Sequence, residues 1–174
     1  MSLFIHEIIH VALSFLVFFA VWKLSRQTSS IKHLASIILS SLIGGVLVDL
    51  DHLVEYFLAF GLQFRPDYFL KGYQFLKLDK LYVPFHSWEL VFLLFMLIFV
   101  LSRIFHLGSR IKLSVLSFTL ALFFHILVDT ATNHVTLQGY SFLYRARYNF
   151  DIKYLVDPAH YQNHLKLKST TKFQ

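Results

Sequence analysis

The chain has 174 residues, of which 56% are hydrophobic and 15% charged, and it contains 20 Phe, 9 Tyr and 2 Trp. Soluble globular domains carry about 25% charged residues, so this composition excludes an ordinary soluble domain or a disordered chain and indicates a membrane protein. The formal net charge of +6 then predicts basic loops rather than a nucleic-acid partner. Because the chain has no Cys, any metal site must use His, Asp and Glu.

Four apolar stretches are long enough to cross a bilayer, which takes about 20 residues in a helix. They cover Phe4–Leu24, Leu34–Phe60, Phe85–Ser102 and Leu113–Ala131. Two short basic connections, Ser25–His33 and Arg103–Lys112, predict that consecutive helices are antiparallel neighbours. We therefore predict an all-α, polytopic integral membrane protein. Residues 1–174 form a single membrane domain in this prediction, an antiparallel bundle of four transmembrane helices embedded in the lipid bilayer.

The segments outside these helices are aromatic and basic. Gly61–Pro84 carries four basic residues between aromatic ones, together with Pro66 and Gly72, which predicts an interfacial segment. Residues 132–174 mix Tyr and Phe with Arg and Lys. This mixture predicts a cover at the level of the lipid headgroups, with the last ten residues as a loose basic tail.

Acidic residues are scarce, yet they concentrate in the apolar segments. Ionisable groups at membrane depth are costly and mark functional sites. Six of the ten Asp and Glu lie within or at the ends of the predicted helices: Glu7, Asp49, Asp51, Glu55, Glu89 and Asp129. At 1.5 Å per residue, His10, Asp49, His86, His125 and Asp129 all come about 18 to 24 Å above the side of the short connections. Antiparallel helices would thus bring these polar residues to one level.

The spacing of these residues predicts a metal site. Pairs such as His125 and Asp129, or His86 and Glu89, lie four or three residues apart and share a helix surface. Imidazole with carboxylate is a ligand set for zinc first, and also for manganese or iron. The residues predicted to bind one or two such divalent ions are His10, Asp49, His52, His86, His125 and Asp129. Asp51 or Glu55 would act as general base; in an alternative role, Glu55 and Glu89 would orient an imidazole.

Other polar and small residues carry weaker expectations. His6 is expected in the core or at headgroup level, and solvation is expected for four histidines in loops or in the tail: His33, His106, His160 and His164. Gly44 and Gly45 predict close approach of a neighbouring helix. Arg145 and Arg147 are candidates to hold an anionic headgroup.

The acidic and histidine motifs together resemble a known family. The motifs are Val46-Leu47-Val48-Asp49-Leu50-Asp51-His52, Phe85-His86-Ser87 and Phe124-His125-Ile126-Leu127-Val128-Asp129. In this order they resemble the membrane-bound metal-dependent hydrolases, also labelled LexA-binding, inner membrane-associated hydrolases. His10 is similar to the N-terminal His of that family, and Gly139–Ile152 to its aromatic and basic run. The family usually has Pro where this chain has Val48, and His-Arg-Gly-x-Thr-His-Ser where this chain reads Leu-Tyr-Val-Pro-Phe-His-Ser over residues 81–87.

The resemblance implies an integral protein of the cytoplasmic or inner membrane with metal-dependent hydrolase activity. The leading prediction is hydrolysis of an ester or phosphoester, in a lipid or a membrane-proximal substrate, by metal-activated water. Carboxylates and imidazoles on several helices also suit a carboxylate-bridged di-iron or di-metal oxidoreductase. The third possibility is a non-catalytic membrane scaffold with a structural polar or metal site.

Overall fold

The structure, a computed structural model, describes residues 3–25, 30–104 and 108–173. Residues 26–29 and 105–107, which belong to the two predicted short connections and include Arg26 and His106, lie outside the described residues. Within the described ranges all regular elements are helical, and two isolated β-bridges join loop segments. The chain divides into two compact units. Unit 1 comprises Met1–Val48 and Trp88–Val128, and unit 2 comprises Asp49–Ser87 and Asp129–Gln174.

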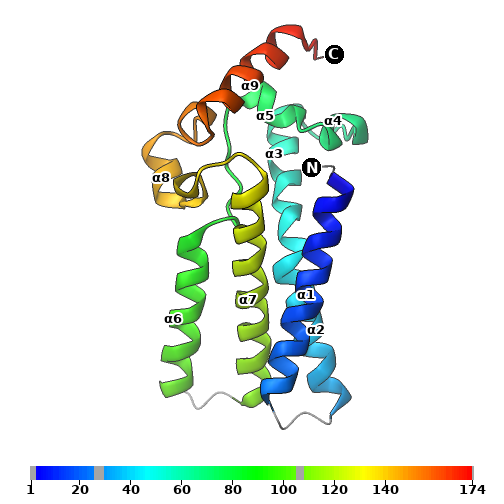
Figure 1. The fold of residues 1–174 in the computed structure, drawn as a ribbon, viewed down its shortest axis with the longest axis vertical. Helices are drawn as coiled ribbons and strands as arrows, with labels where there is room; N and C mark the ends of the chain where they lie inside the picture. Colours follow the sequence, from blue (N-terminus) through cyan, green and yellow to red (C-terminus); the bar gives the residue numbers. More distant parts are fainter. Residues whose placement is uncertain (1–2, 26–29, 105–107, 174) are drawn as a thin grey trace. The chain divides into compact units, whose positions relative to one another are not determined.

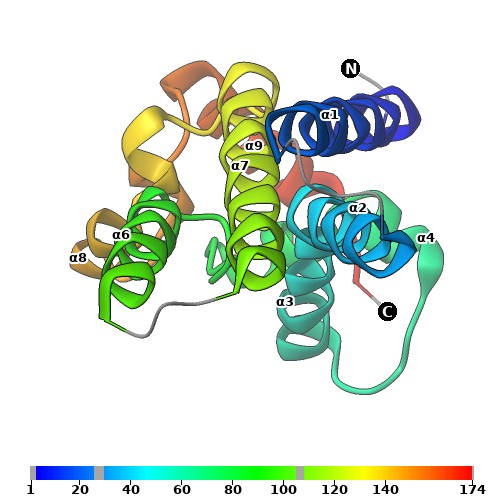
Figure 2. The same cartoon turned by 90° about the horizontal axis from the view of Figure 1, so that it is seen from below.

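Unit 1 consists of long apolar helices. They are α1 (Leu3–Ser25), α2 (Ile31–Gly45), α6 (Trp88–Ile104) and α7 (Ser109–Thr132), of which α7 continues into unit 2. Figures 1 and 2 show α1 and α2 as an antiparallel pair, with α7 beside them and α6 on the other side of α7. A small core of Val17, Val21, Ile37 and Ala121 joins α1, α2 and α7.

Small residues allow α2 to approach its neighbours in unit 1 closely. A Cβ atom on Gly44 would lie 2.3 Å from the carbonyl oxygen of Phe118, and one on Gly45 would lie 2.1 Å from Oγ of Ser14. Ser117 Oγ donates a hydrogen bond to the carbonyl of Ile37 at 3.1 Å, so α2 and α7 are also joined by a polar contact. The close approach predicted for Gly44 and Gly45 is confirmed.

Two helices among the described residues are long and apolar enough to cross a bilayer, namely Ile5–Ser25 within α1 and Ser109–Thr132, which is α7. The interrupted pair Ile31–Gly45 and Leu47–Phe60 would add a third span. With 17 residues, α6 is shorter than the other candidates. The structure therefore supports a membrane protein with two or three spans by length and composition.

The predicted helix Leu34–Phe60 is wrong as a single element. It is divided into α2, the 3₁₀ turn η1 (Leu47–Leu50) and α3 (Asp51–Phe60). The interruption follows the glycine pair Gly44–Gly45, where Val46 leaves helical geometry with φ −131° and ψ −51°. Glycine lowers helix propensity, which explains why the chain breaks at this point. A new helix N-terminus thereby forms at Asp51, where the helix dipole stabilises negative charge.

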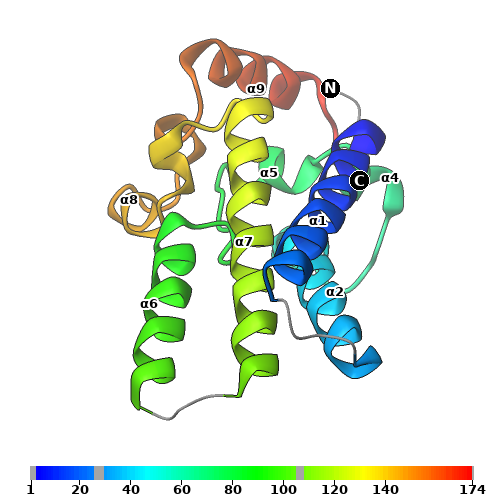
Figure 3. The same ribbon diagram turned by 60° about the horizontal axis from the view of Figure 1, so that its bottom comes forward.

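Unit 2 is built from short helices and loops. They are α3, α4 (Pro66–Leu70), α5 (Tyr73–Leu78), η2 (Leu137–Tyr140), α8 (Phe142–Arg147), η3 (Ile152–Tyr154) and α9 (Pro158–Thr170). In this unit α5 contacts α3, α4 and α9, and Figure 3 shows α5 and α9 close together. Bridges between Lys80 and Asp151 and between Val135 and Val156 tie loop segments together around a core of Leu81, Val83 and Leu155.

The C-terminal end of the described chain is ordered against unit 2, so the predicted loose tail is wrong. The Asp79 carboxylate accepts from Nε2 of His164 at 2.9 Å and from the Lys168 ammonium, and the Phe173 ring lies 6.0 Å from that of Phe60. Partial burial alone would raise the pKa of Asp79, but the bonds from Lys168 and His164 hold this pKa below its usual value. His164 is buried rather than solvated.

The glycine contact in unit 1 gives a stability prediction. Gly44→Ala places a methyl group against the Phe118 carbonyl, which belongs to the backbone and cannot rotate away. We expect this variant to lose about 1–3 kcal/mol of stability, seen as a lower melting temperature in detergent. Gly108→Ala is the matched control, because nothing lies within 4 Å of its added Cβ. Equal melting temperatures for both variants would contradict the close packing of α2 on α7.

Candidate metal centre

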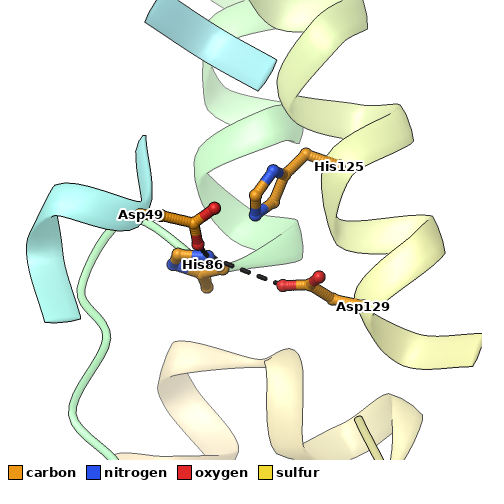
Figure 4. A group of neighbouring side chains, drawn as sticks. All are labelled: Asp49, His86, His125 and Asp129. Carbon is orange, nitrogen blue, oxygen red and sulfur yellow. Dashed lines mark hydrogen bonds and ion pairs between the residues drawn. The ribbon is translucent and has the colours of Figure 1, made fainter. Parts of the chain in front are cut away.

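The acidic motif of unit 2 forms a compact polar cluster with a histidine and an aspartate from distant parts of the chain. Asp49 comes from η1, His52 from α3, His86 from the loop before α6, and Asp129 from the last turn of α7. Figure 4 shows Asp49 and Asp129 directed at the His86 ring. The cluster contains two groups of possible metal ligands, in each of which one donor atom per side chain lies within 4.8 Å of the others. The groups are Asp49, His86 and Asp129, and Asp51, His52 and His86.

The donor atoms have the separations that ligands of one ion have. His86 Nε2 lies 3.1 Å from Asp49 Oδ1 and 3.6 Å from Asp129 Oδ2. His52 Nε2 lies 3.6 Å from the same Asp49 oxygen. Four donors about 2.1 Å from a tetrahedral Zn²⁺ are about 3.4 Å apart, and octahedral neighbours about 3.0 Å. Asp49, His86 and Asp129 are therefore spaced to hold a divalent ion, and His52 Nε2 lies beside the same Asp49 oxygen.

Both imidazoles are oriented by a second carboxylate. His86 Nδ1 lies 3.0 Å from Asp51 Oδ2, and His52 Nδ1 lies 3.3 Å from Glu55 Oε2. An ionised carboxylate only accepts hydrogen bonds, so each Nδ1 carries the proton. In a neutral ring this leaves the lone pair on Nε2, the atom that faces Asp49. Such carboxylate–histidine pairs fix the tautomer and ring orientation of metal-binding histidines.

The cluster gathers four carboxylates in unit 2. Asp51, Glu55 and Asp129 are buried, and the side chain of Asp49 is 21% exposed. Arg145 is the one buried Lys or Arg in the described part of the chain. Buried carboxylates are strongly unfavourable unless hydrogen bonds or cations stabilise them. A divalent cation at this place would stabilise them directly.

One side of the cluster is accessible. The side chains of Asp49 and His52 are 21% and 27% exposed, whereas those of His86 and Asp129 are almost completely buried. A catalytic metal site needs one position open to water or substrate, while a structural site is closed by protein ligands. The partial exposure of Asp49 and His52 leaves this side of the cluster accessible.

His86 reaches the cluster from a loop, not from a helix. The predicted helix Phe85–Ser102 begins instead at Trp88 and ends at Ile104, so the prediction that His86 and Glu89 share a helix surface is wrong. Pro84 has no N–H to donate, and the Phe85 N–H donates to Asp51 Oδ2 at 3.0 Å. Asp51 therefore anchors both the backbone of this loop and the ring that the loop carries.

Unit 1 contains the remaining predicted ligands in a histidine cluster of its own. The rings of His10 and His125 are stacked with centroids 3.9 Å apart, and His10 Nε2 lies 2.9 Å from Nε2 of His6. Nδ1 of His125 donates to the Gly45 carbonyl at 3.0 Å, which assigns its lone pair to Nε2. His6 is buried, as expected for a core residue. That His10 and His125 bind the same ion as the carboxylates stays a prediction.

Two residues of the predicted cover have roles that the sequence did not indicate. Burial raises the pKa of the Tyr140 hydroxyl, and the negative charges of Asp129 and Asp49 raise it further. Tyr140 is thus a neutral phenol near the carboxylates. In the sequence, its position soon after the end of α7, which carries Asp129, is the feature that could have indicated this role. Arg145 is buried and donates to backbone carbonyls, so the expectation that it holds an external headgroup is wrong.

Comparison with known proteins adds no assignment. Searches of protein-family models, curated proteins and solved structures find no match to this chain. The resemblance to the membrane-bound metal-dependent hydrolases therefore stays a prediction, and the case for a metal centre depends on the geometry of the residues themselves.

Removal of the Asp51 carboxylate tests how the His86 ring is held. Asp51→Ala removes the acceptor for His86 Nδ1 and for the Phe85 N–H, so the Nε2 lone pair is no longer fixed toward Asp49. We expect Zn²⁺ affinity, measured by competition with a coloured chelator, to fall about 10- to 100-fold. Asp67→Ala is the control, because Asp67 is exposed and pairs with Arg65. Unchanged affinity in Asp51→Ala would show that Asp51 does not orient a ligand.

Proposed function

We propose that this chain is a membrane-embedded, metal-dependent hydrolase whose ion is bound by Asp49, His52, His86 and Asp129. The observation that carries the proposal is the pair of anchored imidazoles. Carboxylates hold both Nδ1 atoms, and both Nε2 atoms face the Asp49 carboxylate. His10 and His125 are proposed as additional ligands on the basis of the sequence. Nitrogen and oxygen donors favour zinc, with manganese or iron(II) as further candidates.

The proposal includes four transmembrane helices; length leaves open both the interrupted pair Ile31–Gly45 and Leu47–Phe60 and the helix α6. Of the α6 side chains, only Val91 is buried, and large apolar side chains are exposed along its whole length. In water such a surface would form an unusually large apolar patch. Its 17 residues span about 26 Å, close to the thickness of the hydrocarbon core. Lipid contact explains this helix without a protein partner.

The chain's own groups supply the remaining parts of a hydrolytic site. A bound divalent ion would lower the pKa of its water and polarise the attacked oxygen of the substrate. Of the two predicted bases, Glu55 has both carboxylate oxygens engaged, which supports its alternative role of orienting His52. Asp51 Oδ1 has no hydrogen-bond partner among the described residues and is the better candidate to accept a proton. The Tyr140 phenol is a candidate donor.

The surroundings of the accessible side favour a lipid-like substrate. The cluster belongs to a chain with two or three helices apolar and long enough to cross a bilayer. An ester or phosphoester attached to an acyl chain could therefore keep its chain in the lipid while its polar group reaches the cluster. In the alternative di-iron centre Glu55 would not be the bridging carboxylate, because both of its oxygens are already engaged by His52 and by backbone N–H groups.

The proposal is tested by metal content and hydrolysis measured on the same samples. We expect purified protein to retain about one equivalent of a divalent metal and to cleave fluorogenic acyl-ester or phosphoester lipid analogues in nanodiscs, with activity lost after chelation. Asp49→Ala combined with His86→Ala should lose both properties. A control with Asp67→Ala and His134→Ala changes exposed residues of the same types and should retain them.

Two results would contradict the proposal. Metal-free wild-type protein would exclude the ion, and metal-dependent activity that persists in the double variant would place the chemistry elsewhere. Bound iron with a visible absorption band and no hydrolysis would indicate the oxidoreductase alternative.

A further inference from the structure

The loop that carries His86 is held between two buried side chains of opposite charge. On one side, Glu55 Oε1 accepts hydrogen bonds from the backbone N–H groups of Tyr82 and Val83, the latter at 3.2 Å. On the other side, the Arg145 guanidinium donates to the carbonyls of Tyr82, Val83 and His86 at 2.7, 2.9 and 2.8 Å. Glu55 and Arg145 are each 0% exposed.

This arrangement is suited to fixing a backbone segment. The N–H groups of residues 82 and 83 face the negative side chain, and the carbonyls of the same residues face the positive one, so the peptide dipoles lie along the field between the two charges. Val83 has a φ of 25°, a conformation that costs energy for a β-branched residue and needs support from its surroundings. The planar guanidinium offers several donors in a fixed fork, which an ammonium group does not.

Arg145 acts on the metal centre through this loop. It lies on α8, in the C-terminal cover, 59 residues after His86 in the sequence. Its bond to the His86 carbonyl holds the main chain of His86, while Asp51 holds the ring of the same residue. The segment that bears the ligand therefore depends on α8 being docked.

We infer that Arg145 is a positioning residue for the metal centre and that docking of α8 and metal binding stabilise each other. This inference rests on the proposed metal-dependent function. Because linkage is reciprocal, loss of the Arg145 bonds must weaken metal binding, and metal binding must make α8 harder to detach.

A charge-conserving substitution tests the first half of the linkage. Arg145→Lys retains the positive charge but cannot donate to three carbonyls with a planar fork. Titration of the full-length protein in detergent with Co²⁺ should show about 10- to 100-fold weaker binding and an altered visible band. Arg147→Lys is the matched control, since Arg147 lies on α8 as well but is exposed beside the Tyr148 ring. Its Co²⁺ affinity and spectrum should equal those of the wild type.

Hydrogen exchange of the wild-type protein tests whether metal binding stabilises the docking of α8. This measurement does not depend on whether a variant folds. Addition of Zn²⁺ should slow exchange of the amides of Tyr82, Val83 and α8, and unchanged exchange of α8 would overturn the inference. Equal Co²⁺ affinity of the wild type and Arg145→Lys would also overturn it while leaving the proposed function intact. Wild-type protein that binds no Co²⁺ would refute the proposed function, and the inference with it.

Discussion

Compensation of buried negative charge is the constraint on which the structure of unit 2 depends. Asp49, Asp51, Glu55 and Asp129 lie in a chain with little polar surface, where an ionised carboxylate is stable only with strong partners. Two imidazoles and several backbone N–H groups supply hydrogen bonds to these carboxylates. A divalent cation between the carboxylates and the Nε2 atoms would stabilise them further.

The local features of the fold serve that arrangement. The break after Gly45 ends one helix and begins another, so that Asp49 lies in η1 and Asp51 in the first turn of α3. The loop before α6 is not helical, and its backbone groups form hydrogen bonds with the side chains of Glu55, Asp51 and Arg145. Segments distant in the sequence thus converge on His86. The same polar groups that could hold an ion also determine the backbone path, so metal binding would be coupled to folding of the unit.

The sequence predicted the composition of the centre better than its geometry. Hydrophobic runs located α1, α6 and α7 to within a few residues, because apolar length is a local property. The acids of the motif at Asp49 stood out because ionisable residues are rare in apolar runs. Whether a carboxylate binds an ion or orients an imidazole depends on which atom it faces, so spacing alone left the role of Glu55 open. Arg145 and Tyr140 were assigned to the lipid headgroups, since burial by segments distant in sequence has no local signature.

X-ray absorption of the zinc-loaded protein tests the central claim most directly. If carboxylate-anchored His52 and His86 are ligands, the zinc edge must show only nitrogen and oxygen donors at about 2.0–2.1 Å, with the outer-shell scattering of imidazole rings. In His52→Ala the imidazole scattering should decrease by one ring while zinc remains bound with lower affinity. Stoichiometric zinc whose spectrum contains no imidazole contribution, or is unchanged in His52→Ala, would contradict the account.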